Sequence, residues 1–198
     1  FRRILQALDP DVIAIQEHWE WNEINDVVQS WFPGEQWYAS WTYRDLVVLS
    51  RFPILNDANL ISSERTMCAL LDTENELGKK LLIINSHLSC CAYNDSRQEQ
   101  VDEFASVWRN WITNSDGPFD LEFETPFVHV GDFNFVGYRQ QVETLRIGDI
   151  EDENEYGCIR DDIMRVDESY FDLSCNTNTS YPIERSKYVM INYIIELI

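Results

Sequence analysis

Residues 127–134, with the sequence FVHVGDFN, decide the fold class and carry the first candidate site residues. Phe127 to Val130 form a short apolar run, which is typical of a strand buried on both faces. The run ends in a glycine, which lets the backbone turn tightly or approach a ligand, and Asp132 and Asn134 follow it. Because Gly, Asp and Asn are also common turn residues, the segment alone is equally compatible with a plain turn.

Two other apolar runs end in the same way. Residues 12–15, VIAI, are followed by Gln16-Glu17, and residues 80–86 lead into His87. Because a rigid sheet holds the side chains at its rim, strand ends are where a site can gather its groups. Glu17 has the hard oxygen ligands that Mg²⁺ prefers, and His87 can handle a proton or donate to a phosphoryl oxygen. Each residue alone is more often a solvated glutamate or a structural histidine.

Helical and extended segments alternate along the chain. Apolar positions at helical spacing predict a helix up to residue 8 and a longer one from Ser96 to Ile112, with Ser96 and Glu99 as a capping box. With no linker and no internal repeat, we expect one domain over residues 1–198, of the α/β or mixed α+β class. The other expected elements are helices near 22–30 and over 139–145, and strands over 36–41, 46–50, 54–55, 66–71, 80–86 and 188–198.

Composition limits the classes of function. The chain has 198 residues, 44% of them hydrophobic, with 15 Lys+Arg against 35 Asp+Glu and a formal net charge of −20. It is too apolar for a disordered acidic tail, and no run of about 18 apolar residues predicts a membrane-spanning helix. The charge argues against a broad basic face for nucleic acid, which is bound through Lys and Arg. A phosphate-handling enzyme stays compatible with it, because a bound metal supplies positive charge locally.

The cysteines leave the redox setting open. The five are Cys68, Cys90, Cys91, Cys158 and Cys175, and they form no CxxC pair and no spacing typical of zinc. The adjacent Cys90 and Cys91 can pair with other cysteines in an exported protein, or all five can be thiols in a reducing compartment. The acidity favours an exported protein slightly, and the location stays open.

Four segments together resemble a known superfamily. DVIAIQE (11–17), LVVLSRFPI (46–54), LLIINSHL (81–88) and VHVGDFN (128–134) have the order and spacing of the endonuclease/exonuclease/phosphatase superfamily. Its members include apurinic-site endonucleases, deoxyribonuclease I-like nucleases, sphingomyelinases and inositol-polyphosphate 5-phosphatases. The resemblance implies a four-layer sandwich of two mixed β-sheets flanked by helices, and a metal-dependent phosphoesterase.

Carried over residue by residue, the resemblance implies a role for each strand-end group. Glu17 would bind Mg²⁺, with Mn²⁺ as the alternative, and Asp132 would position or activate the attacking water. His87 would lie at the phosphate, and Asn134 would bind the scissile phosphoryl group. The activity implied is hydrolysis of a phosphodiester or phosphomonoester by in-line attack of water.

Two further residues fall on the substrate side in this resemblance. Asn85 precedes His87 and would chiefly support that strand end, and Arg97 follows the loop that contains the adjacent cysteines. Because of the acidity, we expect a small-molecule or lipid-headgroup substrate, with DNA or RNA as the alternative. We expect the protein to be a monomer.

The sequence departs from the superfamily at both ends. Nothing before the first helix corresponds to the family's first strand with its Asn, and no histidine after His129 provides the family's terminal Asp-His pair. Lys187 stands where the family's Arg-x-Asp-Tyr strand has its acid. A fragment trimmed at both ends, with little activity of its own, explains these departures. A non-catalytic binding module that keeps the fold explains them too.

Overall fold

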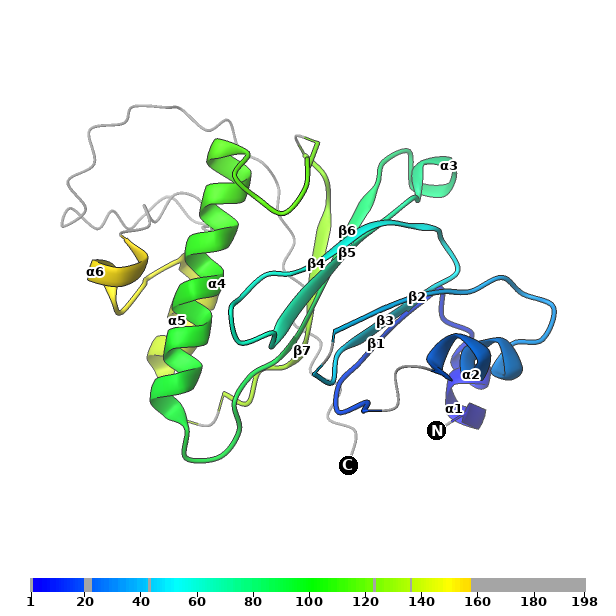
Figure 1. The fold of residues 1–198 in the computed structure, drawn as a ribbon, viewed down its shortest axis with the longest axis horizontal. Helices are drawn as coiled ribbons and strands as arrows, with labels where there is room; N and C mark the ends of the chain where they lie inside the picture. The colour runs from blue at the N-terminus through cyan, green and yellow to red at the C-terminus, as the bar shows by residue number, and fades with distance from the viewer. Residues whose placement is uncertain (1, 20–22, 43, 123, 136, 158–198) are drawn as a thin grey trace. The chain divides into compact units, whose positions relative to one another are not determined.

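The computed structural model describes residues 2–19, 23–42, 44–122, 124–135 and 137–157 (Figure 1). Two compact units divide the chain. Of the described residues, one unit contains those up to His87 together with Thr125–Phe133, and the other contains Leu88–Glu124 and residues 134–157. The strand expected over 188–198 and the departure at Lys187 lie outside the described residues.

The first unit contains an antiparallel sheet of three strands in the order β1-β3-β2. Two helices cover one face of it, because Leu5 and Val28 pack with Ile13, Val47 and Leu49 of the sheet in one buried cluster. The elements are α1 (Arg2–Leu8), β1 (Val12–Ile15), α2 (Ile24–Trp31), β2 (Tyr38–Trp41) and β3 (Val47–Ser50).

A second sheet in the same unit is mixed, with the order β4-β5-β6-β7. The pairs β4-β5 and β5-β6 are antiparallel, and β6-β7 is parallel. The connection between β5 and β6 contains a one-turn helix, which is followed by Gly78 with a left-handed φ of 72°. The elements are β4 (Ile54–Asn59), β5 (Thr66–Leu71), α3 (Glu74–Leu77), β6 (Leu81–His87) and β7 (Phe127–Asp132).

The two sheets pack face to face. Leu46 and Val48 meet Met67, Ala69 and Ile83 in one fully apolar cluster. Alternate residues of a strand point to opposite faces, so this cluster fixes which side chains of the four-stranded sheet face the other sheet. Each of the larger side chains, Ala69 excepted, contributes about 1.5–3 kcal/mol when it leaves water. The predicted α/β class with two facing sheets and flanking helices is confirmed, although the described strands of the smaller sheet are all antiparallel, not mixed.

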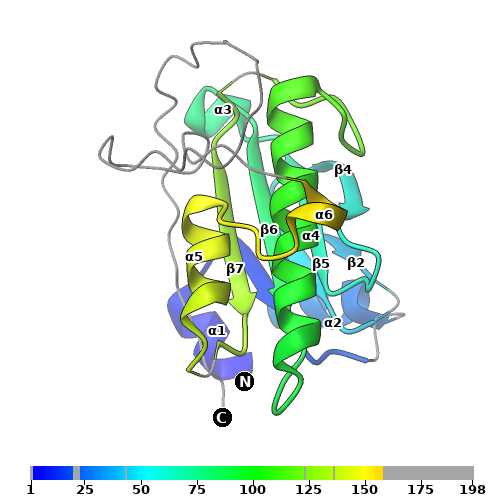
Figure 2. The same cartoon turned by 90° about the vertical axis from the view of Figure 1, so that its left-hand side faces the viewer.

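The second unit is helical in its described part. Helix α5 (Arg139–Ile147) lies beside part of the longer α4 (Asn94–Asn114) and contacts it (Figure 2), and α6 is the single turn Glu153–Tyr156. The predicted capping box at Ser96 is wrong, because α4 begins earlier, after Tyr93, and no side chain caps it. The predicted helix itself is confirmed, and it buries Val101, Phe104 and Trp108.

Hollows and helix lengths add two facts. An apolar hollow of about 220 Å³ opens between β1 and β7, with Val12, Ala14, Val128 and Val130 among its lining residues. None of the described residues that line it has a charged side chain.

Within the part of the chain that is described, no helix combines the length and apolar character needed to cross a bilayer.

Candidate active site at the rim of the sandwich

Strand directions bring polar groups from five strands to one rim of the first unit. Because β6 and β7 are parallel, His87 lies directly beside Asp132 in the register. Ile15, the last residue of β1, is paired with Val47, the first residue of β3, since those strands are antiparallel. The rim therefore receives the carboxyl ends of β1, β6 and β7 and the amino ends of β3 and β5.

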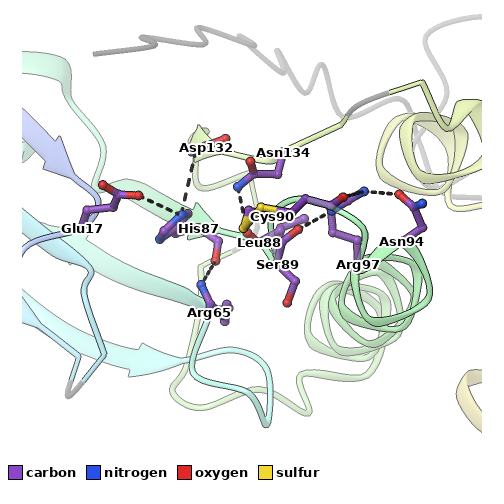
Figure 3. Close-up of a disulfide and its surroundings, with 11 residues drawn as sticks. Glu17, Arg65, His87, Leu88, Ser89, Cys90, Asn94, Arg97, Asp132 and Asn134 are labelled. Carbon is purple, nitrogen blue, oxygen red and sulfur yellow. Dashed lines mark hydrogen bonds and ion pairs between the residues drawn. A yellow bond between two sulfur atoms is a disulfide. The ribbon is translucent and has the colours of Figure 1, made fainter. Parts of the chain in front are cut away.

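His87 is the centre of this rim (Figure 3). Its Nδ1 lies 2.5 Å from Oδ2 of Asp45, which is only 2% exposed. Its Nε2 lies 3.9 Å from Oε1 of Glu17 and 4.0 Å from Oδ2 of Asp132. The side chains of Glu17 and Asp132 are 74% and 44% exposed, so they offer their carboxylates to solvent. The structure thus brings together three of the residues that the sequence predicted.

The surroundings of His87 favour its protonated form. The hydrogen bond to Asp45 raises the pKa of His87 above its ordinary value, and the charges of Asp45 and Asp132 act in the same direction. Burial and the charge of Arg65 oppose the rise. Because Asp45 accepts from Nδ1–H, the other ring nitrogen is left to face the two exposed carboxylates.

Glu17 has an unusual backbone. Its φ of 61° lies in the left-handed region, which non-glycine residues enter at a cost and which is over-represented at functional sites. An exposed carboxylate beside a second carboxylate suits Mg²⁺, which is often held by one or two carboxylates and several waters. The described residues contain no group of three or more His, Cys, Asp or Glu side chains close enough to enclose a metal. Glu17, the predicted metal ligand, presents its carboxylate to solvent at this rim, with its side chain 74% exposed.

Two groups at the rim, Asp45 and Arg65, were not among the sequence-predicted residues. Asp45 stands just before β3. Arg65 stands just before β5, and its Nη1 donates to the carbonyl of His87 over 3.2 Å. Both precede a strand, whereas the sequence pattern singled out residues that follow one. A polar residue placed immediately before an apolar run was the available signal, and it becomes informative once the antiparallel pairing is known.

Asn85 lies beneath the rim, without contact with solvent. Its side chain donates to the carbonyls of Ile15 and Val47, both over 3.0 Å, and accepts from Nε2 of Gln16 over 2.6 Å. These bonds join the two sheets directly below Glu17 and His87. The supporting role expected for Asn85 fits this position. A substrate contact does not, because Asn85 is 0% exposed.

Gly131 is required for packing. Its φ is 138°, and a Cβ at this position would lie 1.9 Å from the carbonyl oxygen of Ser86 on β6. Only glycine allows β7 to approach β6 this closely. The close approach for which the sequence suggested a ligand is therefore an approach between two strands, and it holds Asp132 beside His87.

Asn134 and Arg97 belong to the second unit. Asn134 has a left-handed φ of 52°, and its Nδ2 donates to the carbonyl of Leu88 over 2.9 Å. Arg97 is 0% exposed, and its guanidinium donates to the carbonyl of Ser89, to Oδ1 of Asn94 and to Oε1 of Gln141. The basic side chain expected to face the substrate is instead committed to protein acceptors. We assign Arg97 a structural role.

Comparisons with known proteins agree with the fold. No protein-family model and no curated protein matches the sequence. Among solved structures, ANGEL2, a 2′,3′-cyclic phosphatase, matches with a TM-score of 0.51 and 18% identity over 73% of this chain and 45% of that chain. The human Nocturnin catalytic domain with bound sulfate matches with a TM-score of 0.51 and 17% identity, over 72% and 60% of the two chains.

A third match carries the name of the superfamily. An endonuclease/exonuclease/phosphatase family protein from Leptotrichia buccalis has a TM-score of 0.51 and 14% identity, over 73% of this chain and 64% of that chain. The chain thus spans between 45% and 64% of the length of these structures. It has the endonuclease/exonuclease/phosphatase fold, which confirms the fold that the sequence segments predicted.

Proposed function

We propose that the protein is a metal-dependent phosphoesterase whose reacting groups lie at the rim around His87. One observation carries the proposal: two exposed carboxylates, Glu17 and Asp132, flank Nε2 of a histidine whose other nitrogen is held by a buried aspartate. The shared fold with ANGEL2, which is a 2′,3′-cyclic phosphatase, supports the same reaction class.

Each group at the rim has a step to perform. Asp132 accepts a hydrogen bond from the attacking water and takes its proton as the oxygen approaches phosphorus. His87, protonated and oriented by Asp45, donates from Nε2 to a phosphoryl oxygen and stabilises the charge that develops there. Arg65 adds a positive charge beside His87. We propose that Asn134 also donates to the phosphoryl group, as the sequence resemblance implied.

Glu17 is the proposed magnesium ligand, with Asp132 as its neighbour. When bound, Mg²⁺ or Mn²⁺ supplies a Lewis acid that neutralises charge on the phosphate and on the leaving oxygen. That local charge makes phosphate binding compatible with a net charge of −20. The same net charge favours a small-molecule or lipid-headgroup phosphoester over a long nucleic acid.

The decisive experiment is an assay of the full-length protein on three substrates. Bis-p-nitrophenyl phosphate, sphingomyelin and plasmid DNA would each be tested with Mg²⁺ and with EDTA. We expect hydrolysis of at least one of the first two, lost in EDTA. Preferred cleavage of plasmid DNA would replace our substrate class with a nuclease, and no hydrolysis of any substrate would favour the non-catalytic binding module.

A pair of variants tests the site itself. Asp132→Ala should lower turnover by about 10²–10³, the usual cost of removing one group that acts in the transition state. Asp57→Ala, an exposed aspartate on β4, is the matched control and should leave turnover unchanged. Full activity in a folded Asp132→Ala protein would refute the assignment.

A further inference from the structure

We propose that the disulfide between Cys90 and Cys91 is a redox switch, opened by a dithiol reductant, for the loop that follows His87. The pair lies in the connection between β6 and α4, and both cysteines are exposed. The sequence left open pairing with other cysteines or no pairing, and the structure instead joins the two neighbours to each other. The consequence for turnover rests on the proposed function, whereas the redox step itself does not.

The position of the disulfide favours a local role. A cross-link between adjacent residues closes the shortest loop a chain offers, so it restricts the unfolded chain least and contributes little to global stability. Exposed disulfides are the ones that thiols reach and exchange with. Cys68 behaves differently: it is buried, and burial raises the pKa of its thiol to about 12, which makes it inert. Cys158 and Cys175 lie outside the described residues.

Side chains of α4 hold the loop that contains this disulfide through hydrogen bonds. Buried Arg97 donates from Nη1 to the carbonyl of Ser89 over 2.5 Å and approaches that of Cys91 at 3.4 Å. Gln100 binds Ser89 twice, accepting from its backbone N–H and donating to its Oγ, both over 3.0 Å (Figure 3 shows the Arg97 side of this contact). Cys91 itself has a left-handed φ of 62°, a backbone conformation that needs such restraints.

The same loop holds a proposed site residue. Leu88, its first residue, accepts from Nδ2 of Asn134 over 2.9 Å, and this bond orients the amide (Figure 3). A change in the path of the loop changes the position of that carbonyl. The disulfide and the contacts from Arg97 and Gln100 together hold this path, so opening the disulfide releases one restraint on the carbonyl that anchors Asn134.

The redox step balances as an ordinary exchange. A thiolate of the dithiol attacks one cysteine sulfur, the Cys90–Cys91 bond breaks, and a mixed disulfide forms. The second thiol of the reductant then displaces the protein sulfur and closes its own disulfide. Two electrons and two protons pass to the protein, which gains two thiols, and the dithiol is oxidised.

The test uses the full-length protein with Cys158→Ser and Cys175→Ser, with dithiothreitol as the dithiol. Peptide mass mapping after alkylation should show Cys90 and Cys91 unlabelled before reduction and both labelled after it. Hydrogen exchange of the peptide that covers residues 88–93 should quicken on reduction, and turnover should fall by about tenfold, the lower end of the effect of losing a supporting contact. The Cys90→Ser/Cys91→Ser variant is the control: it should behave like the reduced protein with or without dithiothreitol.

Three results decide the inference. Alkylation of both cysteines without reductant would overturn it, because no disulfide would be there to open. A reduced pair with unchanged exchange of residues 88–93 and unchanged turnover would overturn it too, because the loop would not respond. If no phosphoester is hydrolysed in either state, the proposed function fails, while faster exchange on reduction still supports a switch in the loop.

Discussion

His87 and His129 stand on neighbouring strands of one sheet and differ in almost every property that matters for chemistry. Both are nearly inaccessible, at 7% and 2% exposure. His87 ends β6 on the face that packs against the other sheet, where Asp45 holds its Nδ1 at 2.5 Å. His129 lies on the opposite face of β7, where its Nε2 is 2.8 Å from the hydroxyl of Ser86.

The two histidines show how the environment decides which one can react. The aspartate outweighs burial at His87, and the net effect raises its pKa. At His129 burial lowers the pKa to about 3, so its ring is neutral at ordinary pH. A fixed carboxylate thus makes a nearly buried histidine a proton donor, whereas a hydroxyl leaves it a neutral part of the core.

The largest expected effect on turnover comes from removing the ring of His87, and removing the ring of His129 provides the comparison. His87→Ala should lower turnover by about 10²–10³, because it removes a donor aimed at the developing charge. His129→Leu keeps most of the volume of the side chain, so it should leave turnover per folded molecule unchanged. Turnover on bis-p-nitrophenyl phosphate, with circular dichroism to establish folding, measures both. Equal losses in the two folded variants would remove the distinction drawn between the two faces.

Asp45 is the main cause of the difference in pKa between the two histidines. Its removal should therefore bring the pKa of His87 closer to that of His129. Asp45→Asn keeps the shape but removes the charge, and it should lower turnover by about tenfold, the scale typical of a partner that orients a reacting group. The pKa of His87, followed by NMR, should fall, and the alkaline limb of the pH–rate profile should move to lower pH with it. Asp57→Asn is the control, since Asp57 is exposed on β4. An unmoved profile in Asp45→Asn would mean that Asp45 does not set the protonation of His87.

Opposite pKa shifts predict opposite slopes of stability against pH. Between pH 6.5, the ordinary histidine pKa, and about pH 3, His129 is protonated in the unfolded chain but neutral in the folded protein. The free energy of unfolding therefore falls as the pH falls through this range. Above 6.5, and up to its raised folded pKa, His87 keeps a proton that the unfolded chain has lost, so stability falls as pH rises. Each slope approaches about 1.4 kcal/mol per pH unit for one proton.

Urea unfolding of the EDTA-treated protein between pH 5 and 8 should therefore give a maximum near pH 6.5. His129→Leu should flatten the acid side, and Asp45→Asn should flatten the alkaline side. The charged groups that face His87 are Asp45, Glu17, Asp132 and Arg65, and the alkaline slope is their combined effect. If the free energy of unfolding of Asp45→Asn still fell as the pH rose above 6.5, a group other than the Asp45–His87 pair would cause the alkaline slope.

The sequence predicts the residues that follow strands better than those that precede them. Glu17, His87 and Asp132 each end an apolar run, a local pattern, and the structure brings the three together. Asp45 and Arg65 come to the same rim only because β3 and β5 run antiparallel to their neighbours. That pairing is a long-range property, so the polar residue before each apolar run points to the site only once the pairing is known.

The family resemblance was misleading at Arg97. It implied a basic residue on the substrate side, yet the guanidinium of Arg97 donates to carbonyl and amide oxygens of Ser89, Asn94 and Gln141 inside the protein. The sequence cannot show that a loop turns its carbonyls inward. The capping box at Ser96 was also misleading, because the N-cap of α4 is Tyr93, three residues before Ser96.

The smallest expected effect comes from removing the hydroxyl of Ser86, which is the partner of buried His129. Ser86 lies 2.8 Å from both His129 Nε2 and Thr66 Oγ1, and all three side chains are buried. Ser86→Ala should therefore lower the free energy of unfolding by about 1–2 kcal/mol, because it leaves a ring nitrogen and a hydroxyl without this partner. Turnover should not change, since the hydroxyl points away from His87, its chain neighbour. Urea unfolding and the phosphoester assay on the same preparation measure both. A loss of turnover without a loss of stability would show that the two faces of the sheet are coupled, which the contrast between His87 and His129 excludes.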